Sequence, residues 1–148
     1  MKKIITLLFL TIGLVVNAQS IDYNTSSGYA LEGYDVVAYF SNVAKKGNSS
    51  YVATHDNIKY KFSSKANLNT FKANPTKYLP QYGGYCAYAV GARNKKVTPD
   101  PETFEIRDGK LFVFYKSWRR NTFDLWKKEG PEKLKAKADK NWGKLKTK

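Results

Sequence analysis

The fold class follows from residues 104–115, whose sequence is FEIRDGKLFVFY. Large apolar residues alternate with charged ones over 104–107, and an apolar run follows at 111–114. Asp108-Gly109 stands between the two runs and is among the strongest signals for a two-residue hairpin turn, because both central positions need a positive φ. We therefore expect two antiparallel strands joined by a tight turn.

A second hairpin is expected nearer the N-terminus. Residues 51–54 and 59–62 are two short runs of alternating large residues, separated by His55-Asp56-Asn57-Ile58, and Asp-Asn is a good tight-turn pair. Ser63-Ser64 then offers a hydroxyl to the free amides of a first helical turn. The sequence predicts a helix over 66–73, ended by Pro75.

Two further helices are expected at the C-terminal end. Apolar residues fall at helical spacing on both sides of the breaker Gly130-Pro131, and we expect them to be buried against the sheet. The first set is Trp118, Thr122, Leu125 and Trp126, and the second is Leu134, Ala138, Trp142 and Leu145. Together these patterns predict a small single α+β domain in which two β-hairpins pack against several helices.

The N-terminal segment has the pattern of a cleavable signal peptide. Lys2 and Lys3 precede an apolar run over residues 4–16, and small residues stand before a cleavage position after Ala18. A run of about 13 residues reaches roughly 20 Å as a helix, too short for a hydrocarbon core of ~30 Å. We expect a signal peptide at 1–18, a flexible lead-in at 19–28 and one domain at 29–148, in a bacterial periplasmic or secreted protein without a stable membrane anchor.

The chain is strongly basic, with 26 Lys and Arg residues against 12 Asp and Glu, a net charge of +14. Loss of Lys2 and Lys3 with the signal peptide would leave +12, and the C-terminal helix is rich in lysine. Lysines without interleaved arginines and exposed aromatic residues are poor readers of bases. We interpret this helix as a solvated face and expect a monomer that does not bind nucleic acid.

Several segments of the sequence resemble the YHS-domain family, in its exported, stand-alone bacterial branch. The segments that carry the resemblance are GYDVVAYF at 33–40, FSS at 62–64, ANP at 73–75, YLPQYGGYCA at 78–87, DP at 100–101, DGKL at 108–111 and ADKNW at 138–142. The resemblance spans residues 33–145. It implies a domain of the kind found attached to heavy-metal pumps and suspected of binding metal. The branch that this sequence resembles is also similar to proteins in which selenocysteine can occupy the position of Cys86. The metal-associated form has additional cysteines, whereas this chain has one.

Cys86 is the first candidate for chemistry. A lone cysteine cannot form an internal disulfide, and a free cysteine is most often a small buried apolar group. Gly83-Gly84 before it and the apolar residues after it place it at the expected start of a helix, where unpaired amides favour the thiolate. We expect a soft metal ion such as Cu(I), or another thiophilic ligand, to bind there.

Five other residues complete the candidate site. His55 is the only histidine; on a hairpin tip it is usually a surface residue, but near Cys86 it could be a base or a second metal ligand. We expect the two to approach within reach of one bridging ion or water, because short connections keep consecutive elements adjacent. We expect Asp35 to be a capping carboxylate, to bind a tyrosine, or to line a pocket. The pocket residues are expected to be Asp35, Tyr82, Tyr85 and Tyr88, although such tyrosines are more often part of a core.

Two alternatives to a binding module stay open. Cys86 could be a redox thiol, which would need a thiol-bearing partner to resolve it, since the chain has no second cysteine. The domain could also be structural, with Cys86 as a buried filler. The chain has no Walker loop, no Gly-x-Ser-x-Gly and no His-Glu-x-x-His, so its motifs give no support to hydrolase or phosphotransfer chemistry.

Overall fold

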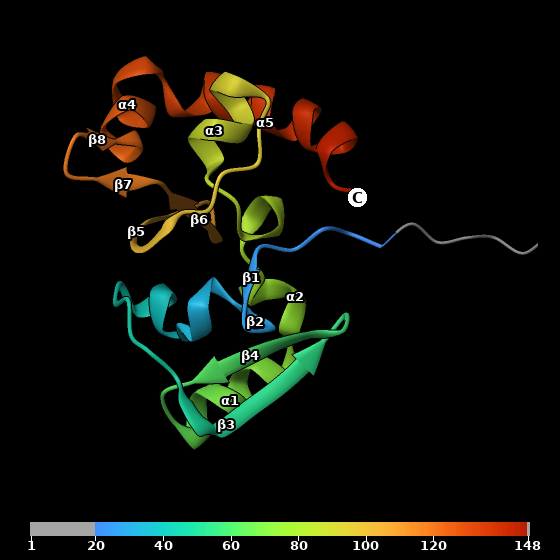
Figure 1. The fold of residues 1–148 in the computed structure, drawn as a ribbon. Helices are drawn as coiled ribbons and strands as arrows, with labels where there is room; N and C mark the ends of the chain where they lie inside the picture. Colours follow the sequence, from blue (N-terminus) through green and yellow to red (C-terminus); the bar gives the residue numbers. More distant parts are fainter. Residues whose placement is uncertain (1–19, 148) are drawn as a thin grey trace, which may run out of the picture.

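The hairpin of β5 (Asp100–Arg107) and β6 (Lys110–Phe114) forms as its sequence predicts, and the other elements lie on its two sides (Figure 1). The computed structural model describes residues 20–147, so the expected signal peptide at 1–18 lies outside the described residues. The strands are β1 (Thr25–Ser26), β2 (Tyr29–Ala30), β3 (Asn48–His55), β4 (Ile58–Phe62), β5 (Asp100–Arg107), β6 (Lys110–Phe114), β7 (Lys116–Ser117) and β8 (Arg120–Asn121). The helices are α1 (Lys65–Ala73), α2 (Pro75–Tyr78), α3 (Ala87–Arg93), α4 (Thr122–Glu129) and α5 (Pro131–Leu145), with 3₁₀ turns η1 (Leu31–Gly33), η2 (Ala38–Ser41) and η3 (Gln81–Gly84). The α+β prediction is confirmed.

Both predicted hairpins are present, and both turn where expected. Asp108 and Gly109 have φ of 51° and 68°, and Asp56 and Asn57 have φ of 50° and 64°. These positive values match the right-handed twist of the strands that the turns join. The β3–β4 hairpin belongs to a four-stranded sheet in the order β1-β2-β4-β3, while β5 and β6 form a separate two-stranded sheet.

Helix α1 begins at the predicted cap. Ser64 has an extended backbone, and its hydroxyl accepts a hydrogen bond of 3.1 Å from the amide of Asn67. This bond satisfies one of the free amides of the first turn. The helix presents Leu68 and Phe71 to the sheet and ends at Ala73, so this prediction is also confirmed.

Strand β6 separates two hydrophobic cores. All four of its residues from 111 to 114 are buried, and successive side chains of a strand point to opposite faces. Leu111 and Val113 enter the first core, whereas Phe112 and Phe114 enter the second. One strand thus contributes to both halves of the domain.

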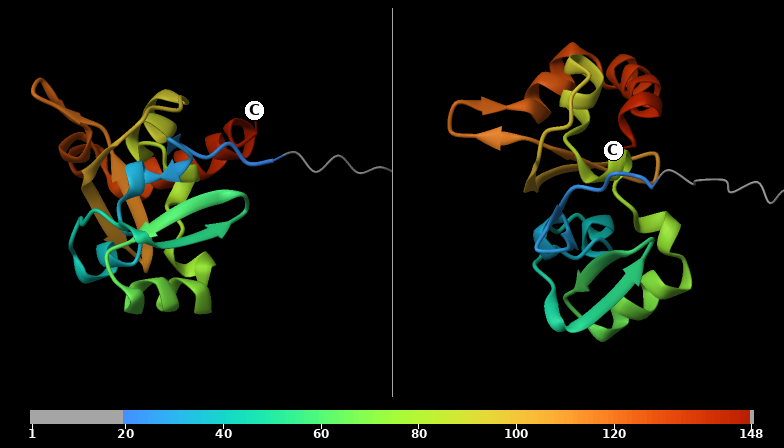
Figure 2. Two further views of the ribbon diagram at one scale, coloured as in Figure 1. Left: turned by 60° about the horizontal axis from the view of Figure 1, so that its bottom comes forward. Right: turned by 45° about the vertical axis from the view of Figure 1, so that its right-hand side comes forward.

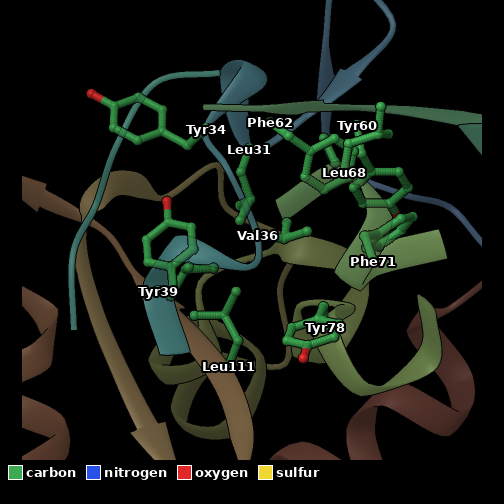
Figure 3. Close-up of a cluster of buried hydrophobic side chains, with 12 residues drawn as sticks. Leu31, Tyr34, Val36, Tyr39, Tyr60, Phe62, Leu68, Phe71, Tyr78 and Leu111 are labelled. Atoms are coloured by element: carbon green, nitrogen blue, oxygen red, sulfur yellow. The ribbon is translucent and has the colours of Figure 1, made fainter. Parts of the chain in front are cut away.

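The first core lies between the β3–β4 hairpin, α1 and the segment 30–39 (Figure 3). Tyr60 and Phe62 of β4 pack against Phe71 of α1, and their ring centroids lie 4.9 and 5.0 Å from that of Phe71. The buried residues of the first core are Ala30, Leu31, Tyr34, Val36, Tyr39, Tyr60, Phe62, Leu68, Phe71, Tyr78, Leu111 and Val113.

The second core lies between β6 and helices α3, α4 and α5 (Figure 1). Helices α3 and α5 approach closely at Gly91, where a Cβ atom would stand 2.6 Å from the carbonyl oxygen of Leu134. Asn141 of α5 also donates a 2.8 Å hydrogen bond to the carbonyl of Val90. The buried residues of the second core are Tyr82, Cys86, Ala87, Tyr88, Ala89, Val90, Phe112, Phe114, Trp126, Leu134 and Ala138.

The prediction for Trp118 is wrong. It lies outside any helix, in the turn of the short β7–β8 hairpin, and is 85% exposed rather than buried. Helix α4 begins only at Thr122, because the side chain of Asn121 caps it by accepting from the amide of Phe123. Figure 2 shows the hairpin extending away from the rest of the chain.

Residues 20–28, expected to be a flexible lead-in, are hydrogen-bonded to the body of the domain. The amide of Asp22 donates to the carbonyl of Lys146, and the amide of Asn24 donates to the carbonyl of Gly83. Strand β1 then pairs with β2. Among residues 20–147, none of the helices combines the length and the apolar character needed to cross a bilayer.

Candidate functional site

Cys86 lies at the N-cap position of α3, one residue before the first helical turn. Its amide donates to the carbonyl of Val97 at 2.9 Å, and its own carbonyl accepts from the amide of Val90 at 3.1 Å. Its side chain does not cap the helix and is fully buried in the second core. The sulfur is therefore not hydrogen-bonded to the first-turn amides of α3; its partners are Tyr115, directly after β6, and Thr122, at the start of α4.

A closed set of hydrogen bonds holds the thiol. The amide of Tyr115 donates to Sγ of Cys86 at 3.2 Å, and Sγ lies 3.3 Å from Oγ1 of Thr122. Because the Thr122 hydroxyl donates to the carbonyl of Tyr115 at 2.7 Å, its hydrogen is already used. The thiol must then be the donor in the contact with Thr122. Sequence reasoning missed Tyr115 and Thr122, since neither is near Cys86 in the chain.

His55 does not join Cys86. It stands at the end of β3, with Nε2 3.6 Å from Oδ2 of Asp56 and its ring edge-on to Phe71. The β3–β4 hairpin and the start of α3 lie in different halves of the domain (Figures 1 and 2). The expected approach fails because the hairpin packs its tip against α1. Within residues 20–147, no three His, Cys, Asp or Glu side chains are grouped so that they could hold a metal ion.

Asp35 stabilises the fold rather than lining a pocket. It is fully buried, and its two oxygens accept five hydrogen bonds from uncharged donors. Oδ1 accepts from the amides of Val37 and Ala38, at 2.9 and 3.2 Å. Oδ2 accepts from the amide and hydroxyl of Ser63 and from Nδ2 of Asn67, at 2.7 to 2.8 Å. These bonds join the segment before η2 to the start of α1, as expected for a capping carboxylate.

The three candidate tyrosines have separate environments. Tyr82 lines a cavity of about 330 Å³ beside Trp142, and burial together with a 2.8 Å hydrogen bond to Asp139 raises its pKa. Tyr85 donates to Asp22 at 3.0 Å, and burial and that bond raise its pKa to about 12. Tyr88 donates to Glu129 at 2.8 Å, and its pKa is raised mainly by burial and further by this hydrogen bond. The single tyrosine pocket predicted from the sequence is therefore wrong.

Tyr88 lines a second cavity, of about 180 Å³, which adjoins the thiol. Tyr115 and Thr122, the two residues that hydrogen-bond Cys86, also line it. Cys86 thus lies behind one wall of the cavity. The complete lining is Tyr88, Ala89, Arg93, Val97, Tyr115, Arg120 and Thr122.

Two guanidinium groups give this second cavity a positive character. Arg93 ends α3 and Arg120 lies in β8, and both residues are exposed. The other walls are largely apolar or aromatic. An arginine presents a planar set of donors that suits carboxylates and other oxyanions. Sequence reasoning missed both arginines, because only the β7–β8 turn brings them to the same cavity.

Comparison with protein-family models, with curated proteins and with solved structures finds no match to this chain. The chemistry of the site must therefore be argued from its own geometry. That geometry consists of a buried thiol, two hydrogen-bonding residues in front of it, and a small cavity with two arginines at its rim.

Proposed function

We propose that this chain is an exported, monomeric YHS-type domain that works as a small-ligand binding module, with the cavity beside Cys86 as its site. One observation carries the proposal: Tyr115 and Thr122, which hydrogen-bond the thiol, also line a cavity rimmed by Arg93 and Arg120. Ligand sites in proteins are typically concave and mostly apolar, with a few placed polar groups. The proposal that the chain is exported rests on the pattern of residues 1–18. The proposal that it is a YHS-type domain rests on the segments 33–40 and 78–87.

The lining favours a compact anion with an apolar body and an affinity for sulfur. Two arginines can bind the charged group, and Val97, Ala89 and the tyrosines offer an apolar wall. A thiophilic part of the ligand would face the side of the cavity behind which Cys86 lies. A soft metal ion is the less favoured ligand, because His55 lies in the other half of the domain and the hydrogen-bond partners of Cys86 are a hydroxyl and an amide.

Cys86 is the only thiol in the chain, so an organomercurial reagent reports on this site alone. The probes are 4-(hydroxymercuri)benzoate, which is anionic, and phenylmercuric hydroxide, which has the same ring without the carboxylate. In each reaction a sulfur–mercury bond forms, a mercury–oxygen bond breaks, and the thiol proton leaves with the hydroxide as water. No electrons are transferred, so no oxidant or reductant is needed.

The ratio of the two rates measures the anion preference of the cavity. We expect the wild type to react faster with the benzoate reagent, and Arg93→Gln and Arg120→Gln each to lower the ratio about fivefold, the usual effect of one cation close to a bound anion. Arg119→Gln is the matched control, since Arg119 neighbours Arg120 but does not line the cavity. Thr122→Ala should raise both rates and leave the ratio unchanged, because it uncovers the thiol without removing a charge.

Three results would reject the proposal. The first is a native thiol that resists both reagents, which would favour a buried structural cysteine. The second is an equal rate for the two reagents in the wild type. The third is a loss of preference in Arg119→Gln as large as in Arg120→Gln, because the effect would then come from net charge rather than from the cavity. Equal Cu(I) binding by wild type and Cys86→Ser would separately reject the soft-metal version.

A further inference from the structure

The β7–β8 hairpin, residues 116–121, is an exposed element that the proposed site uses only through Arg120. Its strands pair with each other, Lys116 with Asn121 and Ser117 with Arg120. Figure 2 shows that the turn projects away from the helices. The hairpin carries three cationic side chains and no acidic one.

Trp118 at the turn is the most exposed large apolar residue among residues 20–147, with 85% of its surface free. The other two tryptophans are placed differently: Trp126 is fully buried and Trp142 is half-buried. The guanidinium of Arg119 lies 4.1 Å from the centroid of the Trp118 ring. An apolar ring held under a cation at a projecting turn is the combination that recognises a surface with both apolar and anionic character.

We propose that this hairpin docks the domain on an anionic lipid bilayer, with Trp118 at the level of the headgroups and Arg119 and Lys116 against lipid phosphates. Tryptophan is favoured at membrane interfaces because its ring is apolar while its N–H group remains hydrated. Each cation near an anionic surface strengthens binding about fivefold, which corresponds to about 1 kcal/mol. The strong net charge of the chain acts in the same direction.

A lipid surface fits the hairpin better than a protein partner does. A stable protein interface buries about 800 Å² on each side, and a two-residue turn with one large apolar side chain offers far less. A bilayer needs no complementary shape, since the headgroup region adapts to an inserted ring. The long side chain of Arg119 can follow the ring and keep its charge at the phosphates.

The test uses full-length protein with vesicles of phosphatidylglycerol and phosphatidylcholine, and with vesicles of phosphatidylcholine alone. All variants share residues 1–19, so differences between them belong to the substitutions. We expect Trp118→Ser to weaken binding to the anionic vesicles about tenfold, on the order of what burial of one large aromatic side chain contributes. Val43→Ser is the matched control, because Val43 is another exposed apolar residue outside the hairpin.

Charge and position are separated by a second pair of variants. Arg119→Gln should weaken binding about fivefold, whereas Lys137→Gln, which removes one charge from the exposed face of α5, should weaken it less than twofold. Neither Trp118 nor Arg119 lines the cavity, so both variants should keep the organomercurial rate ratio of the wild type. Failure of this proposal therefore leaves the proposed ligand site intact, and the reverse also holds.

Tryptophan emission locates the contact. Binding should shift the emission to shorter wavelength and expose it to quenching by lipids brominated near the headgroup, and Trp118→Phe should bind while losing both signals. Equal binding to both kinds of vesicle, equal effects of Trp118→Ser and Val43→Ser, or binding without a spectral shift would each overturn the proposal. A Trp118-dependent shift on poly-glutamate with none on vesicles would also overturn it and indicate an acidic polypeptide instead.

Discussion

The first and second cores are built around different kinds of buried polar side chain. In the first core, the carboxylate of Asp35 accepts five hydrogen bonds from backbone and side-chain donors in residues 37–38 and 63–67. In the second, the thiol of Cys86 makes two weaker contacts and lies behind a cavity. The first arrangement fixes the path of the chain, whereas the second leaves a buried nucleophile close to a space that a ligand can enter.

The difference shows how to separate structural from functional polar residues in this fold. A buried polar group whose hydrogen-bonding capacity is filled by local donors has no capacity left for a ligand. Asp35 meets this description. The second cavity differs, because its two arginines, Arg93 and Arg120, are not buried polar groups but are exposed at the rim. We therefore expect substitutions near Asp35 to change stability, and substitutions around the second cavity to change binding.

The largest expected effect is at Asp35. Asp35→Ala would leave the buried amide of Ala38 and the half-buried amides of Val37 and Ser63 without their partner, so we expect a loss of about 4–6 kcal/mol in the free energy of unfolding, or failure to fold. Asp35→Asn keeps one oxygen and should lose about 2–3 kcal/mol. Urea denaturation followed by circular dichroism measures both.

The control for Asp35 is Asp124→Asn, since Asp124 is an exposed partner of Lys127 on α4. It should change stability by less than about 0.5 kcal/mol. Equal denaturation midpoints for Asp35→Asn and wild type would contradict the structural role of Asp35. The comparison between the two cores would then lose its basis.

The next effect tests whether the two cores are one unit. Leu111 and Phe112 are neighbours on β6 but enter different cores. Each substitution to Ala should cost about 3–4 kcal/mol, because it leaves a cavity in a packed interior. If the domain unfolds cooperatively, each variant should speed amide hydrogen exchange in the slowest-exchanging residues of both α1 and α5.

Hydrogen exchange in Leu111→Ala that rises in α1 while α5 keeps its wild-type protection would contradict this prediction. It would mean that the cores unfold separately and that β6 does not couple them. Val43→Ala is the control, because Val43 is exposed and belongs to neither group of buried residues.

Features with local causes could be predicted from the sequence. Asp108-Gly109 and Asp56-Asn57 decide their own turns through positive φ, and Ser64 decides the start of α1 through its own hydroxyl. Trp118 was misplaced because it stands four residues before Thr122, a spacing that suits a helix. The cap at Asn121 stops the helix short of it, and a spacing pattern does not show a cap.

The candidate site was harder to predict, because its residues meet only through the tertiary fold. Cys86 was identified as a candidate, but Tyr115, Thr122 and Arg120 reach its surroundings from later elements of the chain, and Arg93 lies at the opposite end of α3. The tyrosines at 82, 85 and 88 were expected to share one pocket. They diverge because Tyr82 and Gly83 have left-handed backbones, with φ of 54° and 61°, which turn the chain within η3.

The smallest expected effect concerns the contact between the second core and the N-terminal segment. Tyr85 donates to Asp22, and burial and this bond raise its pKa to about 12, from about 10 in an unfolded chain. The contribution of the neutral phenol is complete below pH 10 and is lost as the pH rises towards 12, because the unfolded chain ionises first. Tyr85→Phe should cost about 1 kcal/mol or less at neutral pH and make stability fall less steeply between pH 10 and 12.

Since Lys96 binds the same carboxylate, the comparison is made between Lys96→Gln and Lys96→Gln/Tyr85→Phe, by urea denaturation at each pH. Tyr82 and Tyr88 also have raised pKa values, so the slope should become shallower rather than vanish. Identical slopes in the two backgrounds would show that Tyr85 does not hold the segment around Asp22 to the second core.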